Sequence, residues 1–214
     1  MAQLRTGRRR YYDIFAPYYD AFIKFHSSRH EDDTRNFLVD AAHLDGKTMP
    51  RILDVCCGTG SVILAFKERY PESEAIGYDF SPGMLRKAQE KDLKGRIVFI
   101  EGDAAALPFD DSSFDVVTCS HALYELKGET REKALQEMKR VVRPDGYVLL
   151  MEHEVPRHPV IKFLFYVRML SMGSKDANEF VKGGLEPFKK VFPQGHFEPF
   201  AERQKQTDEL PKMR

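Results

Sequence analysis

The chain has 214 residues, of which 42% are hydrophobic and 31% charged, so it can bury a sizeable core and is not intrinsically disordered. Lysine plus arginine number 33, and aspartate plus glutamate also number 33. The resulting net charge of zero argues against a dedicated nucleic-acid-binding protein, and no apolar run is long enough to predict a transmembrane helix.

The first ten residues, MAQLRTGRRR, carry four arginines and lack the apolar stretch of a secretory signal. We interpret this basic cluster as a solvated arm, with peripheral contact to a membrane surface as the alternative. Three cysteines, Cys56, Cys57 and Cys119, are too few for a disulfide framework. We therefore expect a cytoplasmic protein with reduced thiols.

The segment before residue 46 is predicted to be helical and rich in aromatic side chains. Residues 11–43 contain seven clustered aromatics, and we expect Pro17 to separate a first turn from a second helix. Another helix is predicted from Asp32 to Leu44, ending near Gly46. These helices form a predicted N-terminal cap over residues 1–45.

From residue 51 onward, strand and helix patterns alternate. The predicted strands are 51–57, 74–80, 97–103, 114–121 and 146–153, and the predicted helices are 61–70, 81–91 and 130–142. Ser81 is expected to cap its helix, with Pro82 at the first helical position. This alternation predicts an α/β fold of the Rossmann-like kind, with a mostly parallel sheet flanked by helices over residues 46–155.

The remaining residues, 156–214, are predicted to add a lid helix and to complete the sheet at its C-terminal end. Residues 159–173 are apolar almost all round, interrupted by Lys162 and Arg168. A buried lid or core helix is the favoured interpretation, and contact with a membrane interface is the alternative. Residues 192–204 are expected to form one further strand.

The strongest local signal is DVCCGTG, residues 54–60, which follows the first strand and precedes a helix. Glycines here let a ligand approach the backbone, and the helix N-terminus favours a carboxylate or phosphate. A dinucleotide fingerprint needs a third small residue, but Ile63 stands at that position. A nicotinamide dehydrogenase is therefore disfavoured.

Read from Asp54, the same segment resembles motif I of the class I S-adenosylmethionine (SAM) methyltransferases, with Cys56 in place of the first glycine. The resemblance continues in order over roughly residues 11–155. Asp79 ends the second strand, SPGML contains Met84, and EGDAAALPF contains Asp103. SFDVVTCSHALYEL resembles the fourth-strand motif, and RVVRPDGYVLL resembles the turn into strand five, with Asp145 in place of a glycine.

This resemblance implies SAM as the cofactor and assigns roles to particular residues. Asp79 would hold the ribose hydroxyls, Met84 would flank the adenine, and Asp103 would read the adenine amino group. The helix N-terminus near Thr59 can favour the SAM carboxylate, and Asp54 can counter its ammonium. The full predicted cofactor set is Tyr19, Asp54, Gly58, Thr59, Gly60, Asp79, Phe80, Met84, Asp103, Ala104 and Ser120.

Within the family, the opening YDIFAPYYD is similar to the subgroup of ubiquinone/menaquinone-biosynthesis C-methyltransferases. Its A-x-x-Y-D pattern falls on Ala16, Tyr19 and Asp20, and DVCCGT also occurs in that subgroup. The implied acceptor is a small hydrophobic molecule such as a quinone precursor. A phospholipid N-methyltransferase and a SAM-binding scaffold protein without turnover are the alternatives.

Candidate catalytic residues follow the fourth and fifth strands, where they can orient an acceptor or remove its proton. We name His121 and His153, with Tyr124, Glu125 and Glu152 nearby in sequence. We predict no metal site. If strands one and four are neighbours, the three cysteines lie close together, and we interpret them as small buried hydrophobic residues.

Overall fold

The structure, a computed structural model, describes residues 2–26, 31–44, 46–126, 128–152 and 186–196. The chain divides into two compact units, Met1–Glu152 and His153–Arg214. The second unit contributes one described helix, α8 (Glu186–Val191), which the sequence analysis did not predict.

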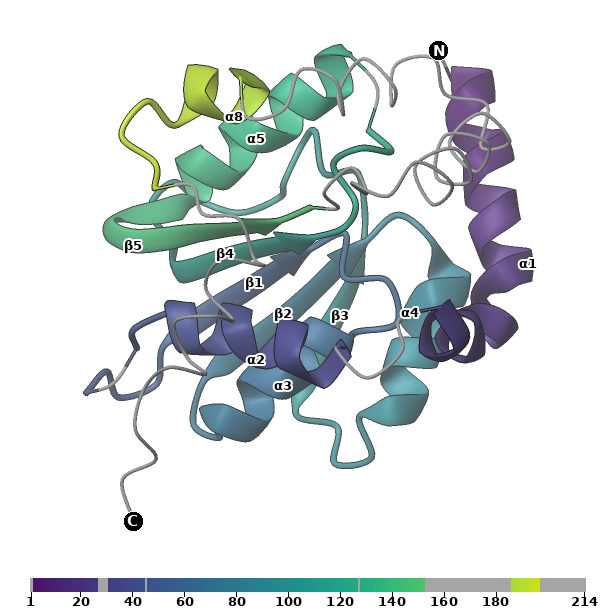
Figure 1. Ribbon diagram of the computed structural model, residues 1–214, viewed down its shortest axis with the longest axis horizontal. Helices are drawn as coiled ribbons and strands as arrows, with labels where there is room; N and C mark the ends of the chain where they lie inside the picture. The colour runs from purple at the N-terminus through teal and green to yellow at the C-terminus, as the bar shows by residue number, and fades with distance from the viewer. Residues whose placement is uncertain (1, 27–30, 45, 127, 153–185, 197–214) are drawn as a thin grey trace. The chain divides into compact units, whose positions relative to one another are not determined.

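The first unit is built on five parallel strands (Figure 1). They are β1 (Arg51–Val55), β2 (Glu74–Asp79), β3 (Ile97–Glu101), β4 (Phe114–Ser120) and β5 (Val142–Met151), in the order β3-β2-β1-β4-β5. Leu53 of β1 pairs with Ile76 on one side and Val117 on the other. The strand order reverses between β1 and β4, and this reversal creates a ligand-binding crevice in open α/β sheets.

Helices cover both faces of this sheet, as the alternating pattern predicted. Figure 1 shows α2 (Glu31–Ala41), α3 (Ser61–Arg69) and α4 (Pro82–Lys91) on one face and α5 (Glu129–Val141) on the other. The fully buried Ile63 and Phe66 of α3 pack with Leu38 of α2 and Ile52 of β1. The predicted fold class is therefore confirmed.

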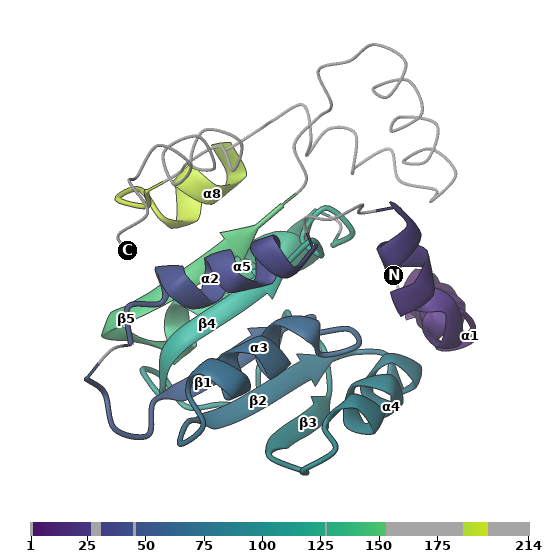
Figure 2. The same ribbon diagram turned by 60° about the horizontal axis from the view of Figure 1, so that its bottom comes forward.

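The N-terminal helix differs from its prediction. α1 runs from Ala2 to His26 without a break, so the expectation that Pro17 ends a first turn is wrong. Figures 1 and 2 show α1 beside α4. Asp13 and Asp20, on either side of the exposed Pro17, both hydrogen-bond to the rest of the first unit. These contacts hold the helix together where proline removes one backbone hydrogen bond.

The fifth strand also begins earlier than predicted, at Val142 rather than residue 146. Val142 pairs with Phe114, and the register then shifts before Tyr147 pairs with Val116. In the second unit, the described residues 192–196 form a turn rather than the start of a strand. Residues 159–173 and 197–204, predicted as a lid helix and the rest of that strand, lie outside the described residues.

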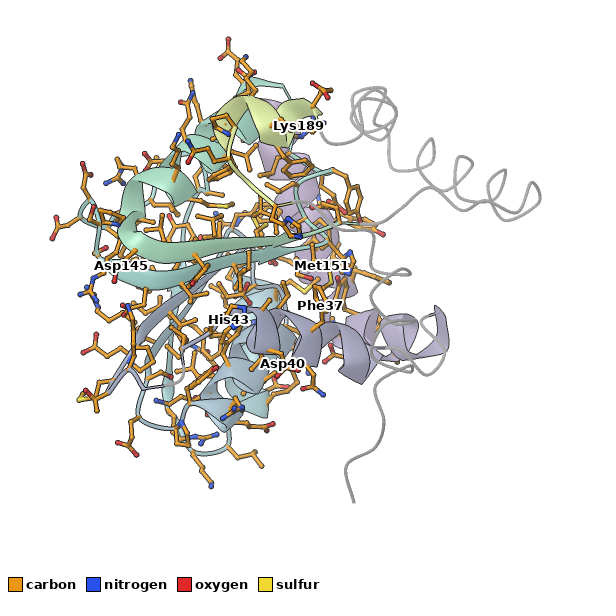
Figure 3. All side chains as sticks on the ribbon, turned by 60° about the vertical axis from the view of Figure 1, so that its left-hand side comes forward. Phe37, Asp40, His43, Asp145, Met151 and Lys189 are labelled. Atoms are coloured by element: carbon orange, nitrogen blue, oxygen red, sulfur yellow. The ribbon has the colours of Figure 1, made fainter. Side chains whose placement is uncertain are left out.

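A buried carboxylate ties the sheet together at its amino edge. Asp115 of β4 accepts hydrogen bonds from Lys47 Nζ at 2.7 Å, Arg143 Nη1 at 2.8 Å and the Arg51 backbone N–H at 2.8 Å. Burial raises the pKa of Asp115, but these hydrogen bonds outweigh it and hold the pKa below its ordinary value. Figure 3 shows the neighbouring Asp145 at the opposite end of β5 from Met151.

We expect Asp115→Ala to lower the free energy of unfolding by about 1–3 kcal/mol, because it leaves the Arg51 N–H without its acceptor. Asp145→Ala is the matched control, since Asp145 is exposed and contacts Lys47 at 3.3 Å. That control should stay within about 0.5 kcal/mol of the parent. Urea unfolding at pH 7 and at acid pH measures both. The Asp115 difference should shrink as pH falls through its lowered pKa, and a constant difference would contradict this account.

Candidate functional site

The glycine-rich turn between β1 and α3 has the geometry of a ligand-binding loop. Cys56, Gly58 and Gly60 all have positive φ, at 58°, 53° and 74°. A Cβ on Gly60 would lie 2.9 Å from the Cβ of Ala88, so glycine is required there for close packing. A Cβ on Gly58 would meet nothing within 4 Å. α3 begins with no side-chain hydrogen bond from its N-cap residue, and the Ile63 N–H of its first turn bonds to Asp54, which leaves the preceding N–H groups for a ligand.

Asp79, at the end of β2, joins this turn to the next loop. Its Oδ2 accepts the Gly58 N–H at 2.9 Å, and its Oδ1 accepts the Ser81 N–H at 2.9 Å. The residue is 5% exposed. Burial raises the pKa of Asp79 to about 6, against the opposing effect of these backbone donors. The backbone N–H of Phe80 also bonds to this carboxylate, so of its roughly four acceptor sites about one remains for a ligand.

Asp54 of β1 lies beneath the turn and is almost fully buried. Its Oδ1 accepts the Thr118 hydroxyl of β4 at 2.8 Å. Its Oδ2 is buried and has no hydrogen-bond partner among the described residues. Burial raises the pKa of Asp54 to about 7, and the nearby charge of Asp79 adds to the shift. A buried acceptor without a donor is the expected state of a group that a ligand completes.

α1 reaches the same edge of the sheet with two polar side chains, Asp13 and Tyr12. Asp13 Oδ1 accepts the Ser81 hydroxyl at 2.7 Å and the Gly83 N–H at 2.8 Å, at the start of α4. A Cβ on Gly83 would lie 2.7 Å from the Cα of Asp13, so glycine permits this contact. Tyr12 donates a hydrogen bond to Glu125, and its ring meets Phe80 edge to face.

Farther along α1, a second polar cluster holds the helix against the glycine-rich turn. Thr59 donates its hydroxyl to Asp20 Oδ1 at 2.6 Å. Lys91, at the end of α4, lies 3.1 Å from Asp20 Oδ2 and 3.0 Å from the Thr59 hydroxyl. Sequence reasoning did not assign Tyr12, Asp13 or Lys91 to the site, and it used Asp20 only for the subgroup. Their role depends on α1 packing beside α4, for which no local motif exists.

The remaining predicted cofactor residues lie on the loops at the carboxyl ends of the strands. Asp103 Oδ1 accepts the Ala105 N–H at 3.0 Å, and the Gly102 N–H donates to the Asp79 carbonyl at 2.9 Å, which ties the loop after β3 to β2. Met84 and Ala104 are buried, and Phe80, Ser120 and Tyr19 are half-buried. No described hydrogen bond or ring contact joins Met84, Ala104 or Ser120 to the glycine-rich turn.

His121 follows β4 in a strained conformation. Its φ is 52°, which is uncommon for a residue other than glycine, and its backbone N–H donates to the Met151 carbonyl at 2.7 Å. Such a conformation costs about 1–3 kcal/mol and is concentrated at functional sites. His121 is therefore held where β4 and β5 both end. His153, the other predicted catalytic residue, lies outside the described residues.

Glu152 lies next to the same junction, directly after β5. Its Oε1 accepts the Leu123 N–H at 2.7 Å, while Oε2 is buried without a hydrogen-bond partner in the described part of the chain. Burial raises the pKa of Glu152 from 4.5 to about 8. At neutral pH the carboxyl is therefore mostly protonated, which avoids a buried negative charge.

The cysteines gather at this edge, as neighbouring β1 and β4 predicted. Cys56 and Cys119 are hydrogen-bonded, and that bond and burial raise the pKa of the Cys119 thiol. Burial likewise raises the pKa of Cys57. All three are free thiols, and the raised pKa values of Cys57 and Cys119 make those two poor nucleophiles and metal ligands. Among the described residues, no group of three or more His, Cys, Asp or Glu is placed to hold a metal ion.

Glu152 makes stability depend on pH in a testable way. Because its folded-state pKa is raised, its stabilising contribution is complete below pH 4.5 and is lost as pH rises toward 8. We expect Glu152→Gln to melt near the parent temperature at pH 4.5 and above it at pH 8.5. Glu129→Gln, at an exposed position, should follow the parent at both. Parallel melting curves for the parent and Glu152→Gln across this range would show that Glu152 is not protonated in the native state.

Among the described residues, no helix is both long and apolar enough to cross a membrane. Comparisons with known proteins identify the family of the chain. A sequence profile described as a methyltransferase domain matches residues 52–146. The Bacillus subtilis YcgJ protein is 25% identical with a TM-score of 0.53, over 82% of this chain and 88% of that one. A SAM-dependent methyltransferase from Aquifex aeolicus, 18% identical over 72% and 87% of the two chains, shares the fold with a TM-score of 0.53.

Proteins related by sequence indicate the subgroup within the methyltransferases. The demethylmenaquinone methyltransferase of Chlorobaculum tepidum is 33% identical over 180 residues, covering 83% of this chain and 72% of the relative. The ubiquinone/menaquinone biosynthesis C-methyltransferase UbiE of Citrifermentans bemidjiense is 34% identical over 177 residues, covering 80% and 74%. The chain therefore belongs to the class I SAM-dependent methyltransferases, in the subgroup of the demethylmenaquinone and ubiquinone/menaquinone methyltransferases.

Proposed function

We propose that this methyltransferase binds SAM on the glycine-rich turn and methylates an aromatic quinone precursor in the cytoplasm. The observation that carries the proposal is the set of unsatisfied groups around the turn. α3 starts without a side-chain cap, and Asp54 Oδ2 is a buried acceptor without a donor. A ligand with a carboxylate and an ammonium on one carbon satisfies both, and SAM has that amino-acid end.

The other predicted residues fit the rest of the cofactor. Asp79 would hold the ribose hydroxyls, since its buried carboxylate lies at the end of β2 and keeps acceptor capacity beyond its backbone donors. Phe80, Met84 and Ala104 would surround the adenine, and Asp103 would accept its amino group. Ser120 and Tyr19 would border the methionine end. When bound, SAM supplies an electrophilic methyl group on a sulfonium.

The chain's own contribution is to position the acceptor and to accept its proton. Methyl transfer is an in-line displacement, so alignment and exclusion of water supply much of the rate. Tyr12, Phe15 and Tyr19 line α1 with half-buried aromatic rings, which suit a planar hydrophobic acceptor. His121, strained at the end of β4, would remove the proton from an acceptor hydroxyl or ring carbon, and His153 is the second candidate base.

An acceptor screen tests the reaction itself. The purified chain would be incubated with SAM and, separately, with demethylmenaquinol, a simple phenol and phosphatidylethanolamine, and the products weighed by mass spectrometry. We expect a gain of one methyl group on the quinol. Methylation of phosphatidylethanolamine alone would instead support the phospholipid N-methyltransferase. Cofactor binding without any product would support a scaffold role.

Asp79→Asn tests the cofactor site. Loss of the charge-assisted hydrogen bonds to the ribose should raise the Kd for S-adenosylhomocysteine by about 10- to 100-fold in titration calorimetry. Asp110→Asn, at an exposed acid, is the control and should bind normally. Melting curves of both variants establish that they are folded. A folded Asp79→Asn variant with unchanged affinity would remove Asp79 from the cofactor site.

His121→Asn tests the base. Asparagine tolerates positive φ, so the backbone should persist while the imidazole is lost. We expect kcat with the quinol to fall about 100-fold or more, with affinity for S-adenosylhomocysteine within about twofold of the parent. His43→Asn is the control, because His43 is exposed, lies two residues after α2 (Figure 3) and also has a positive φ of 46°. Retention of kcat and of its pH profile by His121→Asn would exclude His121 as the base.

A further inference from the structure

α1 has two chemically different faces. Its inner face hydrogen-bonds through Asp13 and Asp20 and buries Ala16. Its outer face exposes Tyr11 by 53%, Ile14 by 64% and Tyr18 by 68%. Positions 11, 14 and 18 lie on one side of a helix because they are three and four residues apart. α1 therefore carries an apolar stripe that no described residue covers.

This outer stripe is the densest group of exposed apolar side chains in the described residues. Three of the seven large exposed hydrophobic residues lie in eight positions of α1, and Met49, Leu93, Val98 and Tyr147 are distributed over other elements. Pro17 and Ala21 are also exposed, and they continue the stripe along the helix. A concentrated apolar patch of this kind marks an interaction surface.

The charged residues of α1 indicate which kind of partner surface would bind its outer face. The helix contains five cations, Arg5, Arg8, Arg9, Arg10 and Lys24, and only two acids. Both acids face inward, Asp13 toward α4 and Asp20 toward Lys91. Arg9 pairs with Glu101 at 2.5 Å, whereas Arg10 is exposed beside the stripe. Between Arg10 and Ala21, the outward side of α1 is thus apolar with one arginine, and both acids of the helix hydrogen-bond on its other side.

We propose that the outer face of α1, the stripe of Tyr11, Ile14 and Tyr18 with Arg10, docks the protein on an anionic lipid bilayer. Amphipathic helices with aromatic residues on the apolar face and arginines beside it lie in the membrane interface. Tyrosine is favoured at that depth, and each arginine near an anionic surface adds attraction.

Docking by this helix would also bring the candidate site close to a membrane-dissolved acceptor. This second inference rests on the proposed function. The inner face of the same helix contacts Phe80 through Tyr12 and the glycine-rich turn through Asp20. A helix docked by its outer face therefore holds the candidate site next to the bilayer. A hydrophobic quinone precursor dissolved there would reach the site without crossing bulk water.

Sedimentation with vesicles tests the docking on the full chain. Vesicles of phosphatidylcholine alone are compared with vesicles that also contain phosphatidylglycerol. We expect binding to the anionic vesicles, weakened by added salt. Ile14→Gln/Tyr18→Gln keeps good helix formers on α1 and should reduce vesicle binding at least about tenfold. Leu93→Gln removes a more exposed apolar side chain outside α1 and should leave vesicle binding unchanged.

Two outcomes would overturn the proposed membrane docking. In the first, the parent chain sediments with neither kind of vesicle. In the second, the Ile14→Gln/Tyr18→Gln variant binds vesicles as the parent does while its circular dichroism is unchanged. Conversion of a parent dimer to a monomer by the same variant, without vesicle binding by either, would assign the face to a second copy of the chain. Titration with S-adenosylhomocysteine should be normal in all variants. Failure of the quinol reaction leaves the vesicle result intact, so the two proposals fail separately.

Discussion

The hydrogen bonds of the Asp79 carboxylate are the interaction on which the rest of the site depends. One oxygen holds the Gly58 N–H of the turn after β1, and the other holds the Ser81 N–H at the start of α4. A single buried group thus fixes two loops that are separated by an entire strand and helix. The cost is a carboxylate taken out of water, which raises the pKa of Asp79 to about 6. Backbone donors offset that cost.

The buried acids at the carboxyl ends of the strands all have raised pKa values. Burial raises the pKa of Asp54, Asp79 and Glu152, and Asp54 and Asp79 also repel one another. At the amino edge Asp115 shows the opposite balance, because Lys47 and Arg143 neutralise it. Asp115, the acid whose charge is neutralised by cations, is therefore the one that links Lys47, Arg51 and Arg143 at the amino ends of the strands. Asp54 and Asp79 lie where the proposed cofactor, with its ammonium and sulfonium, would bring positive charge.

α1 packs against the loops at the carboxyl ends of the strands and presents its other face outward. Asp13 binds the start of α4 and Asp20 binds Thr59 of the turn, so the helix is attached to the two loops that Asp79 joins. Helix pairing of this kind removes both acids of α1 from its outer side. The outer face carries the exposed Tyr11, Ile14 and Tyr18 with Arg10. The proposed membrane contact and the proposed cofactor site are opposite sides of one helix.

The sequence by itself determined the parallel sheet and the glycine-rich turn, because both follow from local patterns. Strand and helix periods alternate from residue 51, Ser81 and Pro82 start α4 as predicted, and neighbouring β1 and β4 bring Cys56 to Cys119. Only the tertiary structure decided the continuity of α1 through Pro17 and the contacts of Tyr12, Asp13 and Lys91. These contacts join residues about 70 to 110 positions apart, and no periodicity or motif records which helix face meets which loop. The local sequence predicted a break at Pro17, whereas side-chain hydrogen bonds of Asp13 and Asp20 fasten the helix on both sides of it.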